Sequence, residues 1–106
     1  MAKFMIKASY TAEGTKGLLK EGGSSRKATV DKLITGLGGS MEAFYFAFGE
    51  ADVFIICDLP DSSTAAAASL AVNVTGTVDV SIIPLLTVHE IDQACKKSVA
   101  YRAPGA

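Results

Sequence analysis

The feature that most limits how this chain can fold is a pair of segments with apolar side chains on both alternating positions of a strand. Residues 41–48 and 52–59 are rich in aromatic and β-branched residues and are bounded by Gly39, Gly49 and Pro60, so they are predicted to be strands joined by a turn. The apolar residues at even-numbered positions are Phe44, Phe46, Phe48, Phe54 and Ile56, and those at odd-numbered positions are Ala43, Tyr45, Ala47, Val53 and Ile55. A sheet built from these strands has two apolar faces, and each face needs a cover.

The first third of the chain predicts a strand followed by a helical region in two pieces. Residues 3–10 alternate apolar and polar side chains with the period of two expected of a strand. Thr11 is a suitable N-cap for a helix over residues 12–21, which the pair Gly22–Gly23 then interrupts. A second helix follows, capped by Ser24 or Ser25 and ended by Gly38–Gly39. Its apolar stripe consists of Val30, Leu33, Ile34 and Leu37.

The second half predicts another helix and a last strand. Residues 60–63 offer several N-caps for a helix that ends at Gly76. Its predicted apolar face consists of Ala66, Leu70 and Val74. Residues 78–86 form the last predicted strand, where Pro84 is tolerable only near the strand end or on an edge. A short helix over residues 88–97 and a flexible tail over 98–106 complete the chain.

This order of elements, strand, helix, strand, strand, helix, strand, predicts an α+β fold of ferredoxin-like βαββαβ topology. We expect a four-stranded antiparallel sheet with two helices on one face, followed by the short C-terminal helix. Because the helices cover only one apolar face, we expect a second copy of the chain to cover the other. The predicted domain spans residues 1–97, and residues 98–106 lie outside it.

Composition and charge exclude several broad classes of function. The chain has 106 residues, of which 49% are apolar and 20% are charged, with a formal charge of −1, which fits a single globular domain without a basic surface for nucleic acid. Lys3 and Lys7 interrupt the start of the chain, and no apolar run is long enough to cross a membrane. We therefore expect a cytoplasmic protein. Cys57 lies in an apolar run and is predicted to be a core residue, and Lys7 is a candidate partner for Asp58.

Several segments resemble the GYD-domain family over about residues 3–97. They are Tyr10–Thr11, Gly17–Ser24, Gly38–Gly39, Phe44–Gly49 with Asp52, and Pro84–Thr87. The family motif of glycine, tyrosine and aspartate corresponds here to Gly49, Ala51 and Asp52, so alanine replaces the motif tyrosine. The resemblance implies a ferredoxin-like subunit related to dimeric α/β-barrel proteins, and it implies no particular reaction.

The segment 17–24 is similar to a phosphate-binding loop, but Gly23 occupies the position of the lysine that such a loop requires. A simpler anion site remains possible at the start of the second helix, where free backbone N–H groups and a positive dipole end favour a carboxylate or phosphate. Ser24 lies at that start, and Lys20, Arg26 and Lys27 are close to it in sequence. The alternative is a structural hinge with solvated charges.

Three further residues are candidates for binding or catalysis. His89 is the only histidine and could act as a general base, although a surface position on the last helix is the simpler interpretation. Tyr45 could donate a hydrogen bond in a pocket, and Asp52 could contribute to a ligand site or shape its turn. No metal site and no cofactor fingerprint can be placed on the sequence, so we expect neither.

Three functions therefore stay open. The first is a homo-oligomeric protein that binds a small organic or anionic ligand through Lys20, Ser24, Arg26, Tyr45 and Asp52. The second is a cofactor-free oxygenase or isomerase of the dimeric α/β-barrel type that uses Tyr45 and His89. The third is an assembly subunit without a ligand.

Overall fold

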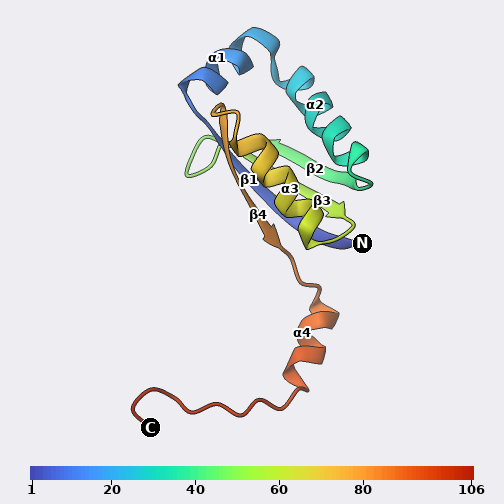
Figure 1. Cartoon of the computed structure of the whole chain (residues 1–106), viewed down its shortest axis with the longest axis vertical. Helices are drawn as coiled ribbons and strands as arrows, with labels where there is room; N and C mark the ends of the chain where they lie inside the picture. Colours follow the sequence, from blue (N-terminus) through green and yellow to red (C-terminus); the bar gives the residue numbers. More distant parts are fainter.

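The computed structural model describes residues 1–106 as one antiparallel sheet with helices on one face, followed by a C-terminal arm (Figure 1). The strand order in the sheet is β2-β3-β1-β4, so the predicted ferredoxin-like fold is confirmed. The strands are β1 (Ala2–Tyr10), β2 (Ser40–Phe46), β3 (Val53–Leu59) and β4 (Val78–Pro84). The helices are α1 (Ala12–Glu21), α2 (Gly23–Gly36), α3 (Ser62–Asn73) and α4 (Val88–Cys95).

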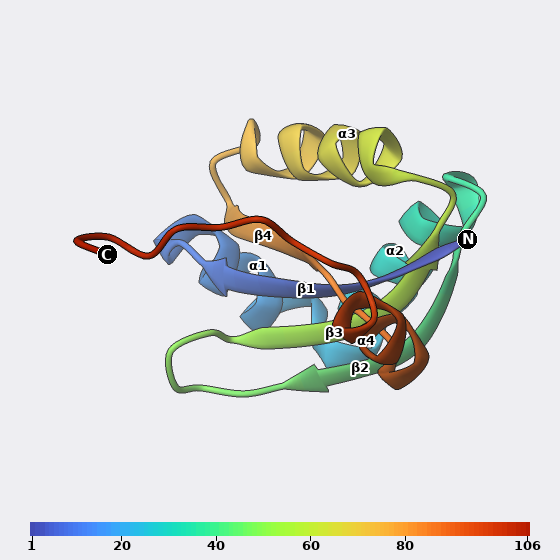
Figure 2. The same ribbon diagram turned by 90° about the horizontal axis from the view of Figure 1, so that it is seen from below.

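The register of the sheet divides each strand into a helix-facing set and an outward set of side chains. Phe4 lies opposite Cys57, Ile6 opposite Ile55, and Ala8 opposite Val53, and all six residues are buried. α2 and α3 cover this face, and α3 packs mainly on β4. Figure 2 shows α3 lying along β4 on this side of the sheet. The core therefore lies between the helices and one face of the sheet, and the predicted core position of Cys57 is confirmed.

The predicted glycine hinge between the first two helices is also confirmed. The Thr11 side chain accepts a hydrogen bond from Gly14 N and caps α1, and Gly22 separates α1 from α2 with a φ of 84°. That φ lies in the left-handed region, which glycine adopts without steric cost. The hinge lets α2 turn from the end of α1 and run back across the sheet. Pro84 is the last residue of β4, which is an edge strand as predicted.

The predicted face of α3 was wrong. The buried side chains are Ala65 and Ala68, whereas Leu70 and Val74 are exposed at 72% and 84%. Small side chains allow the helix backbone to lie close to the sheet, and that close approach turns the larger residues outward.

The predicted partner of Asp58 was also wrong. Lys3 lies opposite Asp58 in the register of β1 and β3, and Lys3 Nζ is 3.3 Å from Asp58 Oδ1. Lys7 instead lies opposite Phe54, and its Nζ is 3.8 Å from Glu50 Oε1.

The outward side chains of the sheet form a surface that no helix covers, which we call the open face. Its apolar members are Met5, Ala43, Tyr45, Phe54, Ile56 and Ile83, and its charged members are Lys3, Lys7, Glu42, Asp58 and Asp79, with Glu50 beside Lys7. Lys3 Nζ is 2.9 Å from Glu42 Oε2, and this hydrogen bond raises the pKa of the Lys3 ammonium against the opposing effect of desolvation. The sheet is therefore partly apolar on both sides, as the alternation pattern predicted.

The C-terminal arm, residues 85–106, leaves the body at the end of β4. Leu85 N donates to Lys3 O at 2.9 Å, which continues the hydrogen bonding between β1 and β4 by one residue. Beyond it, α4 and the tail lie past the end of the sheet and away from the body (Figure 1). Every residue from Leu86 to Ala106 is exposed. No helix in the chain is long and apolar enough to cross a membrane.

Candidate ligand-binding cavity

A cavity of about 60 Å³ lies between the sheet and helices α2 and α3. Of the 17 residues that line it, 16 are hydrophobic, and Arg26 is the only charged one. Strands β1, β3 and β4 supply the floor, α2 supplies one wall, and α3 contributes Ala68 and Val72. A cavity this apolar favours an apolar group as its occupant over water.

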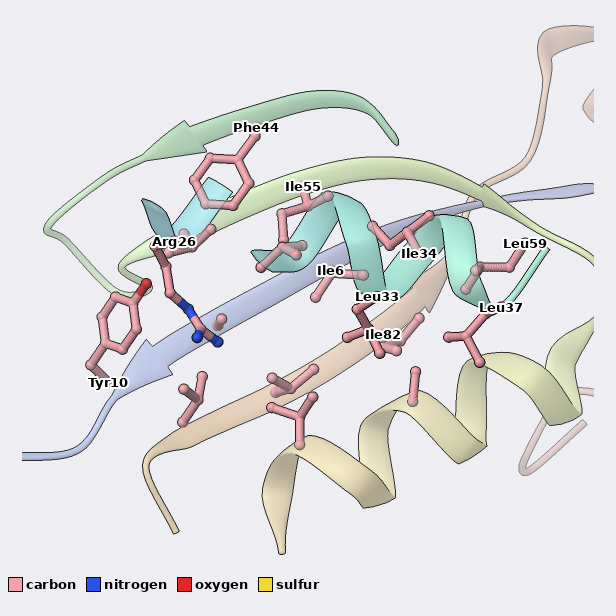
Figure 3. Close-up of a pocket in the computed structure, with 17 residues that line it drawn as sticks. Ile6, Tyr10, Arg26, Leu33, Ile34, Leu37, Phe44, Ile55, Leu59 and Ile82 are labelled. Carbon is pink, nitrogen blue, oxygen red and sulfur yellow. The ribbon is translucent and has the colours of Figure 1, made fainter. Parts of the chain in front are cut away.

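Arg26 extends from the first turn of α2 into this cavity, beside the ring of Tyr10 (Figure 3). Its side chain is half-buried, and its guanidinium makes no salt bridge with any carboxylate of the chain. Its polar neighbour is the hydroxyl of Tyr10. A guanidinium carries five N–H donors in a rigid fork, and one phenol oxygen cannot pair with all of them or balance the positive charge. The arrangement is thus suited to receive an anion that the chain itself does not supply.

Tyr10 lies at the same end of the cavity and is held there by its backbone. Tyr10 N donates to Asp52 Oδ2 at 2.8 Å, and Asp52 N donates to Ala8 O at 2.8 Å. Burial raises the pKa of the Tyr10 phenol, and the nearby positive charge of Arg26 opposes that rise. The phenol therefore keeps its proton at neutral pH and can donate a hydrogen bond to a ligand beside Arg26.

A second hollow of about 140 Å³ adjoins the cavity and shares Tyr10, Arg26 and Val78 with it. Glu13, Gly14, Gly17 and Glu21 of α1 line this hollow. Neither glutamate comes within 4.0 Å of the Arg26 guanidinium. Glu13 pairs instead with Lys16 at 3.5 Å. Arg26 and Tyr10 thus stand between an apolar interior and a polar hollow, which is the place where the charged end of a ligand would lie.

The structure brings only some of the predicted site residues close to one another. Arg26 lines the cavity, and Asp52 touches it indirectly through the backbone of Tyr10. Lys20 and Ser24 are exposed near the hinge and do not line the cavity.

The two candidate catalytic residues lie elsewhere. Tyr45 points to the open face, on the other side of the sheet, and is 71% exposed. His89 lies on α4 in the C-terminal arm, beyond the end of the sheet (Figure 1). Within a single chain, neither side chain reaches the cavity.

The sequence interpretation missed Tyr10 and Phe44 as cavity residues, although the pattern contained a signal for each. Tyr10 continues the helix-facing alternation of β1 after Phe4, Ile6 and Ala8, and Phe44 alternates with Phe46 on β2, opposite the buried Ile55. Arg26 has a similar signal, because it precedes Val30 by four residues and so shares the apolar stripe of α2. An arginine on an apolar stripe usually extends its charged end toward water, whereas Arg26 extends into the cavity (Figure 3).

A family model described as GYD domain matches residues 4–95, which is most of the chain. The chain belongs to the GYD-domain family. No curated protein and no solved structure matches it.

The three motif positions of this GYD domain lie in the turn between β2 and β3. Ala51, which stands where the motif has tyrosine, is 3% exposed and packed inside the turn. Asp52 accepts the hydrogen bond from Tyr10 N and so ties this turn to the end of β1. The aspartate of the motif therefore has a structural role here that holds one wall of the cavity in place.

Proposed function

We propose that this GYD domain binds a small organic anion, a carboxylate with a short apolar tail, in the cavity between its sheet and helices. The observation that carries the proposal is the guanidinium of Arg26, which has no carboxylate partner and lies beside an otherwise apolar cavity. The ligand's carboxylate would take two N–H donors of Arg26 and the hydroxyl of Tyr10, and its tail would fill the cavity. Since one water needs roughly 10–15 Å³ of such volume, the space of about 60 Å³ suits a tail of a few carbon atoms.

The experiment is a titration of the protein with straight-chain monocarboxylates of increasing length, followed by calorimetry or ligand-observed NMR. Binding should strengthen with each added carbon until the cavity is full, by about 0.8 kcal/mol per buried CH₂. The primary alcohol of the same length should bind more weakly, because it lacks the charge that pairs with Arg26.

Arg26→Met tests the role of the guanidinium, and Lys27→Met is its matched control. Lys27 is the next residue on α2 and is exposed. Hydrogen bonds to charged groups contribute about 1.5–3 kcal/mol, so Arg26→Met should weaken carboxylate binding by roughly 10-fold to 100-fold, whereas Lys27→Met should leave it unchanged. Equal affinity for the acid and the alcohol, or unchanged affinity in Arg26→Met, would rule out this function.

The open face supports a second part of the proposal, that the protein is a homo-oligomer in which another copy covers this face. Met5, Phe54 and Ile56 are half-buried without a covering element, and Tyr45 is 71% exposed. A contiguous apolar surface of this kind usually marks an interaction site. Native mass spectrometry at micromolar concentration tests it, and a strictly monomeric protein would contradict it.

A further inference from the structure

The C-terminal arm carries apolar side chains that nothing in its own chain covers. Along α4, Val88, Ile91 and Cys95 are spaced i, i+3, i+7 and so share one face of the helix. Val88 is 80% exposed and Ile91 is 46% exposed. Beyond the helix, Val99 and Tyr101 are 80% and 78% exposed. The arm thus has an apolar face that requires a partner surface.

The helix in the arm also needs such a surface in order to persist. The Thr87 side chain and Glu90 form a complete capping box at the start of α4, so the sequence specifies where this helix begins. However, α4 has only 8 residues, and isolated helices shorter than about 12 residues are marginal in water. A well-capped but short amphipathic helix is typical of an element that is stabilised by packing.

The open face has the charge pattern that matches the arm. Around its apolar centre it carries four carboxylates, from Glu42, Glu50, Asp58 and Asp79, against the two ammonium groups of Lys3 and Lys7. The arm segment after α4 carries Lys96, Lys97 and Arg102 and no acidic residue. α4 itself carries Glu90 and Asp92, so the charge match concerns the tail alone. With the apolar face of α4 on the apolar centre, the basic tail would reach acidic groups at the edge.

We propose that the C-terminal arm of one copy packs on the open face of a second copy, and that the exchange is reciprocal. The inference rests on the proposal that a second copy covers the open face, and it is independent of the ligand. Each chain has one uncovered arm and one uncovered face. In a dimer with two-fold symmetry, each arm therefore covers the open face of the other chain, and the same contact forms twice. The Leu85–Lys3 hydrogen bond holds the start of the arm at the end of its own sheet, and the rest of the arm lies away from the body (Figure 1).

The dimensions of the arm allow this arrangement. α4 is about 12 Å long at 1.5 Å per residue, and residues 96–106 can extend by up to roughly 35 Å. A strand of seven to nine residues spans about 23–30 Å. The arm can therefore follow the length of a partner's sheet.

A cross-linking experiment between two distinguishable copies tests the exchange. One copy carries Ile56→Cys at the centre of the open face together with Cys95→Ser, and the second copy has a different mass and keeps its native Cys95. The two are mixed, allowed to exchange and treated with a short bis-maleimide. The conjugate of the two masses can form only between chains. The control copy carries Leu70→Cys on the exposed side of α3 in place of Ile56→Cys.

The expected result is a mixed conjugate with Ile56→Cys at least ten times more abundant than with Leu70→Cys. A dimer in native mass spectra without this conjugate would overturn the arm exchange, but it would still support the proposal that a second copy covers the open face. A monomer would overturn both. Preferential conjugation at Leu70→Cys would place the arm on α3 and also reject the proposal.

A pair of substitutions on α4 gives an independent test. Ile91→Asp puts a charge on the apolar face, whereas Gln93→Asp puts the same charge on the opposite side of the helix. Ile91→Asp should raise the dimer dissociation constant at least tenfold, and Gln93→Asp should change it less than threefold. Equal effects of the two substitutions would show that α4 makes no specific contact.

Discussion

The contact between α1 and the loop before β4 gives a sharp test of the structure, because two glycines on one helix should respond to alanine in opposite ways. A Cβ atom on Gly14 would overlap the carbonyl oxygen of Thr77 and come within 3.0 Å of its carbonyl carbon. A Cβ on Gly17 would meet nothing within 4 Å. Both glycines lie in α1, so helix propensity favours alanine equally at the two positions, by about 1 kcal/mol.

The cost at Gly14 follows from what the overlap would displace. Thr11 N donates to Thr77 O at 3.1 Å, and the Thr11 hydroxyl donates to Gly76 O at 2.9 Å. Moving α1 away from Thr77 would strain or break these bonds, each of which contributes about 1 kcal/mol. Overpacking itself typically costs about 1–3 kcal/mol. After the gain in propensity, Gly14→Ala should be destabilised by roughly 1–3 kcal/mol, whereas Gly17→Ala should be stabilised by up to about 1 kcal/mol.

The assay is thermal and urea unfolding of both variants and the wild type at one protein concentration, because the midpoint of an oligomer depends on concentration. One kcal/mol corresponds to a change in Tm of about 4–8 °C for a domain of this size. The Tm values of the two variants should therefore differ by roughly 4 °C or more. Gly14→Ala as stable as Gly17→Ala would refute the close packing of α1 against Thr77, and with it the geometry of the polar hollow that both elements line.

Two further predictions concern charge. The Asp61 carboxylate accepts hydrogen bonds from the Thr64 hydroxyl, from Thr64 N and from the Ser63 hydroxyl, and these bonds lower its pKa. The charged carboxylate therefore stabilises the fold at any pH above the ordinary aspartate pKa of about 3.9. That stabilisation is lost as the pH falls through the lower pKa of the folded state. Urea unfolding as a function of pH should show a steeper loss below about pH 4 in the wild type than in Asp61→Asn, and parallel curves would contradict the cap. Glu13→Gln and Glu21→Gln each remove one negative charge from the hollow beside Arg26. Each substitution should tighten carboxylate binding, measured by calorimetry, by about twofold at low salt and by less at high salt. Unchanged or weaker binding would show that the charged end of the ligand lies elsewhere.

The order and type of the elements could be predicted because local signals agreed with the global fold. Thr11 caps α1, Gly22 separates α1 from α2, and Pro84 ends an edge strand, as their conformational preferences require. The face of α3 could not be predicted in the same way. The hydrophobicity of Leu70 favoured its face as the buried one, whereas the close approach of the helix to the sheet buries Ala65 and Ala68. The distance between the helix layer and the sheet is not encoded in the periodicity of either element.

The candidate site shows the same limit more clearly. Arg26 was predicted as a ligand-binding residue and lines the cavity, but it was grouped with Lys20 and Ser24 because they are close in sequence. The direction of its side chain depends on the turn at Gly22, which rotates α2 relative to α1 and points the first turn of α2 into the cavity. Lys20 lies on the other side of this hinge, in α1, and Ser24 shares α2 with Arg26 but is exposed two residues before it. Only the folded chain shows which of the three residues meets Tyr10.

β1 gives a physical reason for the two-sided apolar pattern, because its two sets of side chains face different surroundings. Phe4, Ile6 and Ala8 are buried under the helices, and this set is uninterrupted by charge because the helices exclude water from it. On the other side Met5 lies between Lys3 and Lys7. A sheet face that is buried in a core would not place lysines on both sides of Met5. A sheet face that is exposed to solvent would not place Met5, Phe54 and Ile56 together. An apolar centre with charged flanks is the composition of a protein interface, with its core and rim, so the pattern on this face favours a partner protein over both solvent and a covering helix of the same chain.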